Sequence, residues 1–212
     1  MRYTPAHTDL VTRMRDRLAG VPIISYIGAG SDVVLRSQST NFRRSYSATV
    51  QTIDLMKGLV WGSVGTPIIH RAAGQVREIS NASNELLSVA LHRWVRMNIN
   101  YVPDEVLVEQ GSEGRELLIA PNVLLAMNPA EGDCDDFSMV AAAIATSLGM
   151  AVRFVAVALE KNNPSRYSHI FIQVKDNVGP NGEKDWVTLD CSHGLYAGWE
   201  VSGQLQRYVV NL

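Results

Sequence analysis

The stretch that decides the fold is Gly132-Asp133-Cys134-Asp135-Asp136-Phe137-Ser138, which an alanine-rich segment follows as far as Gly149. Apolar residues recur at helical spacing after Gly132, and Gly149 is a typical stop signal, so the sequence predicts a helix between these glycines. The expected apolar face comprises Phe137, Val140, Ala141, Ile144 and Leu148. Asp133 is a natural N-cap, because its carboxylate can accept hydrogen bonds from free backbone N–H groups. Cys134 is therefore expected at a helix N-terminus.

The position of Cys134 favours chemistry as well as packing. Positive partial charge at a helix N-terminus lowers the pKa of a thiol toward the thiolate form. The negative charges of Asp135 and Asp136 act in the opposite direction. A lone cysteine on an apolar helix face is usually a core residue, so a structural thiol is the alternative. The acids at the helix start could also suggest a metal site, but capping and the helix dipole explain them, and we expect no metal and no cofactor.

Three segments after this helix have the patterns of strands. Residues 151–159 form a nearly continuous apolar run, which is typical of a buried strand. Residues 168–175 and 186–191 alternate between polar and apolar side chains. The stretch between them, residues 176–185, is rich in Gly and Asn and is typical of a turn. These two segments therefore predict a β-hairpin.

The predicted hairpin brings a histidine close to a carboxylate. Facing residues in an antiparallel ladder have a constant sum of residue numbers, so His169 faces Asp190 if Lys175 faces Lys184. Neighbouring registers move the partner by one or two residues without separating the pair widely. A carboxylate orients an imidazole and stabilises its protonated form. Together with Cys134, the pair supplies a nucleophile, a base and an orienting group.

These motifs together resemble the transglutaminase-like superfamily. The resemblance rests on Gly132-Asp133-Cys134-Asp135-Asp136-Phe137-Ser138, Ser168-His169-Ile170, Trp186-Val187-Thr188-Leu189-Asp190 and, upstream, His92-Arg93-Trp94-Val95-Arg96, Asn100-Tyr101-Val102-Pro103-Asp104 and Pro121. It covers about residues 81–212. It implies an α+β fold with a papain-like core, in which the nucleophile helix packs on an antiparallel sheet. The helical patterns upstream predict a mainly helical N-terminal region that precedes this core.

The resemblance also implies the roles of three residues. Cys134 would be the nucleophile, His169 the general base and acid, and Asp190 the group that orients the histidine. Phe171 stands where many members have a tryptophan, which is a modest aromatic exchange and leaves the three residues in place.

Other residues receive secondary assignments from the sequence. An oxyanion hole would use the Cys134 backbone N–H and a second donor, for which Asn128, Trp94 and Tyr101 are candidates. His193 is the rival to His169 as the base, but we expect it in a loop beyond the strand.

Cys191 follows Asp190 directly. Strand alternation points its side chain to the opposite face of the sheet, so we expect buried packing and no disulfide with Cys134.

The sequence predicts two parts of the chain, an N-terminal extension and a core domain. We expect an extension over residues 1–60, helical or irregular and a possible docking arm, and a core domain over residues 61–212. An amphipathic helix is expected over Thr8–Leu18, and further helices over 49–61, 67–79 and 83–98. Residues 1–80 hold ten Lys and Arg against five Asp and Glu, whereas residues 81–212 hold nine against sixteen. This asymmetry suits a docking surface, although two solvated faces would also explain it.

The composition excludes several classes of protein. The chain has 212 residues, of which 46% are hydrophobic and 19% charged, which is ordinary for a globular protein. Two cysteines cannot form a disulfide framework, and no apolar run reaches the roughly 18 residues of a membrane helix. A net charge of −2 argues against nucleic-acid binding. We expect no signal peptide, no membrane partner, and a cytoplasmic or virion-associated location.

Two functions follow as hypotheses from different classes. The first is a cysteine-dependent acyl-transfer enzyme that hydrolyses an amide or peptide, with a protein or peptide substrate, possible examples being peptidoglycan peptides. Hydrolysis is favoured over crosslinking, because a crosslinker must exclude water and admit an amine, for which the sequence has no signal. The alternative is a phage virion structural or assembly protein that retains the fold with little or no catalysis and binds phage structural proteins through residues 1–60.

Overall fold

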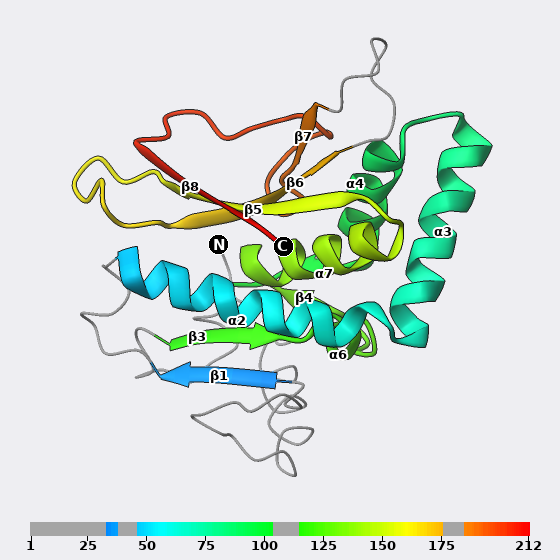
Figure 1. Ribbon diagram of the computed structural model, residues 1–212, viewed down its shortest axis with the longest axis horizontal. Coiled ribbons are helices and arrows are strands. Elements are labelled where there is room, and N and C mark those ends of the chain that lie inside the picture. Colours follow the sequence, from blue (N-terminus) through cyan, green and yellow to red (C-terminus); the bar gives the residue numbers. More distant parts are fainter. Residues whose placement is uncertain (1–32, 38–45, 104–114, 176–184) are drawn as a thin grey trace, which may run out of the picture.

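A four-stranded antiparallel sheet covers one side of a central helix in the computed structural model, which describes residues 33–37, 46–103, 115–175 and 185–212. The strand order is β7-β6-β5-β8, with bounds β5 (Ala151–Ala158), β6 (His169–Lys175), β7 (Trp186–Leu189) and β8 (Gln206–Asn211). The central helix is α7 (Cys134–Ser147), and α2 (Tyr46–Val64) packs against its other side (Figure 1). The α+β fold with a helix on an antiparallel sheet is therefore as the sequence predicted.

The central helix is buried on all sides. Every residue from Asp135 to Ala145 is buried, so the single apolar face expected from the sequence is too narrow. The reason is that the sheet, α2, α3 (Pro67–Ser83) and α4 (Leu87–Asn98) surround α7, and its small alanine side chains let these elements approach closely. Gly149 has a φ of +81°, which fits its predicted role after the end of the helix.

The sequence predicted the positions of the helices upstream of α7 correctly, but the first and last residues of these helices differ from the prediction. The predicted helix over 49–61 corresponds to α2, and the one over 67–79 to α3. The last predicted helix is α4, which begins four residues later than expected, because Asn84 ends α3 in the left-handed conformation with a φ of +52°.

The division expected between residues 60 and 61 falls inside α2. Ile53 and Met56 of this helix are buried in the same core as α7, so α2 belongs to the core rather than to an extension. The predicted helix over Thr8–Leu18 lies outside the described residues. No helix among the described residues is both long and apolar enough to cross a membrane.

The three predicted strands are confirmed as β5, β6 and β7, but the hairpin register differs. Lys175 pairs with Trp186, and Ile172 pairs with Leu189, so the ladder is shifted by two residues from the expected pairing. A shift of two residues keeps every side chain on its predicted face, because strand side chains alternate with a period of two.

Several elements were not expected from the sequence. They are the edge strand β8, the antiparallel pair β1 (Val33–Ser37) and β3 (Arg115–Ile119), the parallel pair β2 (Asn100–Tyr101) and β4 (Glu131–Gly132), and the short helix α6 (Pro121–Leu124). The pair β2–β4 lies next to the start of α7, because β4 ends at Gly132 and α7 begins at Cys134.

Candidate active site

The start of α7 is organised by Asp133. Its carboxylate Oδ1 accepts a hydrogen bond from the backbone N–H of Asp135 at 3.2 Å, and its carbonyl accepts one from Phe137 at 3.0 Å. Asp133 is therefore the N-cap that the sequence predicted. Cys134 is the first residue of the helix and is partly exposed. The thiol thus lies where the helix dipole favours negative charge.

Gly132 and Asp136 explain why this turn has its sequence. Asp136 is completely buried, and its Oδ1 accepts a hydrogen bond from the backbone N–H of Ile119 at 2.9 Å. A Cβ atom on residue 132 would lie 2.4 Å from Oδ2 of Asp136 and 2.6 Å from its Cβ. Only glycine leaves room for this carboxylate. The buried aspartate thereby ties the first turn of α7 to the end of β3.

His169 and Asp190 form a buried pair at one end of the sheet. The imidazole Nε2 and the carboxylate Oδ2 are 2.7 Å apart, and the two residues are 8% and 0% exposed. The Nδ1 atom of His169 makes no hydrogen bond to any residue in the described part of the chain. In a neutral imidazole that donates through Nε2, Nδ1 is the acceptor. The pair therefore leaves a basic nitrogen available for a thiol or a substrate.

Asp190 receives further hydrogen bonds from the turn that follows it. Its Oδ1 accepts from the Ser192 hydroxyl at 3.1 Å and from the His193 backbone N–H at 2.9 Å. Burial by itself raises the pKa of Asp190, but the hydrogen bond and charge of His169 and the bonds from the turn outweigh burial and lower this pKa below its ordinary value. Asp190 is therefore a carboxylate at neutral pH.

Ser138 connects the start of the helix to the start of the histidine strand. Its hydroxyl lies 2.6 Å from the carbonyl oxygen of Cys134 and 3.2 Å from that of Ile170. Ile170 is the neighbour of His169. The first turn of α7 and the first residues of β6 are thus held together at one point.

An aromatic cluster borders the buried pair. The ring of His193 lies edge-on to His169 and to Tyr101, with centroid separations of 4.9 and 5.0 Å, and Tyr101 also contacts Phe137 at 6.2 Å. Burial lowers the pKa of His193, and the charges of His169 and Arg96 lower it further. Asp190 orients the ring of His169 but contacts His193 only through the backbone amide. This difference favours His169 over its rival as the base.

Helix α4 supports the turn that carries Asp190, and the sequence analysis missed this contact. Nε2 of His92 lies 3.3 Å from the carbonyl oxygen of Asp190. Nη1 of Arg96 donates to the carbonyl oxygens of Gly194 at 2.8 Å and Cys191 at 3.3 Å. Burial lowers the pKa of His92, so that its imidazole is neutral at pH 7. The sequence signals were the i, i+4 spacing of these two residues on one helix face and their place in the motif His92-Arg93-Trp94-Val95-Arg96.

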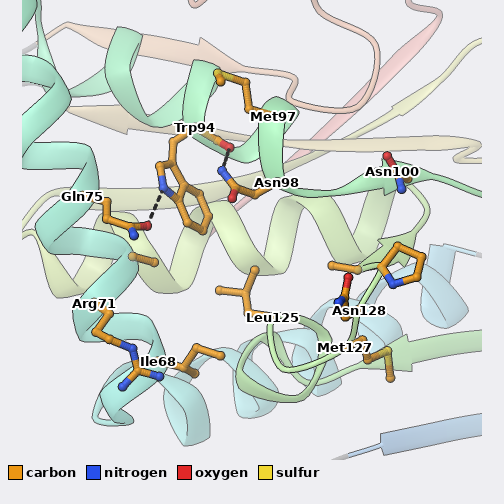
Figure 2. Close-up of a pocket in the computed structure, with 13 residues that line it drawn as sticks. Ile68, Arg71, Gln75, Trp94, Met97, Asn98, Asn100, Leu125, Met127 and Asn128 are labelled. Carbon is orange, nitrogen blue, oxygen red and sulfur yellow. Dashed lines mark hydrogen bonds between the residues drawn. The ribbon is translucent and has the colours of Figure 1, made fainter.

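Trp94 and Asn128 line a hollow of about 480 Å³ between α3, α4 and the segment after α6 (Figure 2). The indole Nε1 of Trp94 donates to Oε1 of Gln75 at 3.0 Å, which occupies its single donor. The side-chain amide of Asn128 makes no hydrogen bond to any described residue. Tyr101, the third candidate for a second oxyanion donor, does not line this hollow and instead contacts the ring of His193.

Cys191 is buried, as the sequence predicted, and packs in the main core. Burial and the charge of Asp190 raise its pKa, so its thiol is not a nucleophile at neutral pH.

Two side-chain clusters have ligand atoms within 4.8 Å of one another, as a metal site would require. They are His169 with Asp190 and His193, and Asp133 with Asp135 and Asp136. Hydrogen bonds to protein groups account for the position of Asp190 and for the capping role of Asp133.

The family model of the transglutaminase-like superfamily matches residues 72–191, which is more than half of the chain. The chain belongs to the transglutaminase-like superfamily. The matched region of this superfamily member begins in α3 and ends one residue after Asp190, so it includes α4, the start of α7 and the β6–β7 hairpin.

A crystal structure of a candidate cysteine protease from Cytophaga hutchinsonii matches with 12% sequence identity and a TM-score of 0.37. The match covers 70% of this chain and 51% of that one, so the chain spans about half the length of that protein. No sequence among the curated proteins matches the chain.

Proposed function

We propose that this superfamily member is a cysteine-dependent hydrolase of amide or peptide bonds, with Cys134 as the nucleophile. The observation that supports the proposal best is the buried His169–Asp190 pair, which leaves Nδ1 of the histidine without a hydrogen-bond partner among the described residues. A buried carboxylate that holds an imidazole in one orientation is the arrangement that activates a thiol or hydroxyl nucleophile.

The reaction would proceed in two stages. Nδ1 of His169 accepts the proton of the Cys134 thiol, and the thiolate attacks the carbonyl carbon of the substrate. The tetrahedral intermediate collapses to a thioester, and His169 gives the proton to the amine that leaves. A water molecule, deprotonated by His169, then attacks the thioester, and the acid and the thiol are released. Asp190 stabilises the imidazolium that forms in each stage.

A protein or peptide is the proposed substrate. Its amide bond must be held against the thiolate for attack to be fast, so the protein needs groups that bind the substrate. Asn128, which lines the hollow between α3, α4 and the segment after α6, is the contact that we propose for it. Asn128 precedes the nucleophile by only six residues, and its amide has both a donor and an acceptor to offer.

The pH dependence of Cys134 alkylation by iodoacetamide tests the proposal. The measurement uses a Cys191→Ser background, so that Cys134 is the single thiol that iodoacetamide can alkylate. We expect a thiol that titrates well below the reference value of about 8.5 and that loses this shift in His169→Ala. A Cys134 thiol that is unreactive, or whose titration is the same with and without His169, contradicts the proposal.

Product formation tests the hydrolytic step separately. We expect the full chain to cleave members of a quenched-fluorescence peptide library and Cys134→Ala to cleave none. Added amines that become incorporated instead of water would show transfer rather than hydrolysis. Full cleavage by Cys134→Ala would exclude the cysteine as the nucleophile.

A further inference from the structure

Large apolar side chains remain exposed together on one side of α4. Met97, Leu195 and Tyr196 are 76%, 75% and 62% exposed. With Val89 they line a hollow of about 440 Å³ between α4 and the segment 195–197. This volume lies within the range of small-ligand pockets, and exposed apolar clusters of this kind mark binding surfaces.

The charged groups that line the same hollow are basic. They are His92, Arg93 and Arg96, and no acidic residue of the described chain lines it. Arg93 is paired with Glu85 at 2.6 Å, and His92 is buried and neutral. Arg96 has no ion pair with any described carboxylate. The hollow therefore combines apolar walls with one uncompensated positive charge.

The guanidinium of Arg96 has donors to spare. It carries five N–H groups, and its bonds to the carbonyls of Gly194 and Cys191 all come from Nη1. The Nε and Nη2 atoms make no hydrogen bond to any residue that the structure describes. One side of this planar group is thus fixed by the protein, while the other retains the two-donor fork that matches a carboxylate.

We propose that this hollow binds the C-terminal residue of a peptide that has an apolar side chain. The carboxylate pairs with Nε and Nη2 of Arg96, and the apolar side chain packs against Met97, Leu195 and Tyr196. A terminal residue fits this arrangement because it carries both groups on one carbon atom. Capture of a terminal carboxylate by fixed donors is a recurrent mode of peptide recognition.

The site lies beside the turn that holds Asp190. Arg96 binds the backbone of Cys191 and Gly194, and His193 between them contacts the ring of His169. A peptide terminus held at Arg96 therefore lies against the same turn as the proposed catalytic groups. The inference concerns binding alone and does not depend on the thiol chemistry of the proposed function.

Titration of the full chain with N-acetyl-leucine and N-acetyl-leucinamide tests the inference by calorimetry and saturation-transfer NMR. We expect the acid to bind about tenfold more tightly than the amide or better, because only the acid can pair with the guanidinium. We expect Arg96→Met to remove this preference and Leu195→Ser to weaken binding of both molecules. Equal affinities for acid and amide, or no binding of the acid at about 10 mM, overturn the proposal.

Two controls separate this site from general effects. Arg77→Met removes the same charge from an exposed position of α3 that lines neither hollow, and it should leave the affinity for N-acetyl-leucine unchanged. An equal loss in Arg77→Met would mean nonspecific attraction and would overturn the proposal. The second control is titration with octanoate, a carboxylate on a simple acyl chain. Tighter binding of octanoate than of N-acetyl-leucine would mean that the hollow binds acyl chains instead of peptides and would overturn the proposal. If Arg96→Met fails to fold, the acid–amide comparison and Leu195→Ser still decide.

Discussion

Asp190 directly follows strand β7, and its Oδ2 lies 2.7 Å from Nε2 of His169, the first residue of β6. The two residues are not opposite each other in the ladder, because Leu189 already pairs with Ile172. The turn after Asp190 closes the offset: backbone and side-chain groups of residues 192 and 193 hold one carboxylate oxygen, and His169 takes the other. The orientation of the histidine therefore depends on a turn as well as on a sheet.

The two histidines beside Asp190 should differ in their effect on the thiol. Asp190 bonds to the ring of His169 but only to the backbone of His193. We expect His193→Ala to retain the pH dependence of Cys134 alkylation and His169→Ala to lose it. The measurement is the alkylation rate against pH for both variants in the Cys191→Ser background. A loss of the pH dependence in His193→Ala alone would make His193 the base.

The two cysteines should react differently with iodoacetamide in the folded chain. Cys191 is 3% exposed and burial raises its pKa, whereas Cys134 is partly exposed at a helix N-terminus. Only a thiolate reacts at a useful rate. We expect intact-mass spectrometry to find one adduct on the native chain, located at Cys134, and two after denaturation. A native adduct at Cys191 would show that the turn after Asp190 opens readily.

Trp94 and Asn128, two of the three candidates for the second oxyanion donor, differ in whether their donors are already used. Trp94 already donates its single N–H to Gln75, whereas the amide of Asn128 makes no hydrogen bond to the described residues. We expect Asn128→Ala to lower the acylation rate of Cys134 by p-nitrophenyl acetate by about 10²–10³-fold, the usual effect of losing one oxyanion donor. Trp94→Phe should change this rate little. Stopped-flow measurement of the acylation burst gives both rates. A larger rate loss in Trp94→Phe than in Asn128→Ala would make Trp94 the oxyanion donor.

Much of the site could be predicted because its signals are local. The helix with Cys134 follows from apolar spacing and an N-cap, and the strands of His169 and Asp190 follow from alternation. Alternation, however, is unchanged by a shift of two residues, so the pattern could not fix the register that the turn length decides. The sheet face on which each side chain of the hairpin lies was therefore predicted correctly, but its cross-strand partner was not.

The missed features depend on contacts between distant parts of the chain. Strand β8 pairs with β5 although about 50 residues separate them, and β2 and β4 have two residues each, too few for a periodic signal. The support of the Asp190 turn by Arg96 joins residues almost 100 positions apart. The docking role of residues 1–60 and the phage association stay predictions, since most of that region lies outside the described residues.

The glycine before the nucleophile turn should be irreplaceable. A Cβ atom on residue 132 would overlap the buried carboxylate of Asp136, and Asp136 holds the backbone of Ile119. We expect Gly132→Ala to destabilise the protein by about 1–3 kcal/mol, the usual cost of overpacking. Gly74→Ala is the matched control, because a Cβ on this exposed residue of α3 meets nothing within 4 Å. It should stabilise the protein by about 0.5–1 kcal/mol through the higher helix propensity of alanine. Urea unfolding measures both, and similar effects would contradict the packing argument.

The lowered pKa of Asp190 predicts how stability depends on pH. A carboxylate whose pKa is lower in the folded than in the unfolded state stabilises the fold above its unfolded pKa of about 3.9. This contribution is lost as the pH falls through the folded pKa. Asp190→Asn lacks the contribution at every pH. The difference in unfolding free energy between wild type and Asp190→Asn should therefore be largest at neutral pH and shrink as the pH falls below about 4.

Urea unfolding at a series of pH values from neutral to strongly acidic measures that difference. Asp54→Asn is the control, because Asp54 is an exposed residue of α2 and has none of the three bonds that hold the Asp190 carboxylate. Its stability difference from wild type should show no comparable dependence on pH. A constant gap between wild type and Asp190→Asn would mean that the carboxylate has the same pKa in both states. The bonds from His169, Ser192 and His193 would then fail to stabilise its charge, and the proposed orientation of the histidine would lose its electrostatic basis.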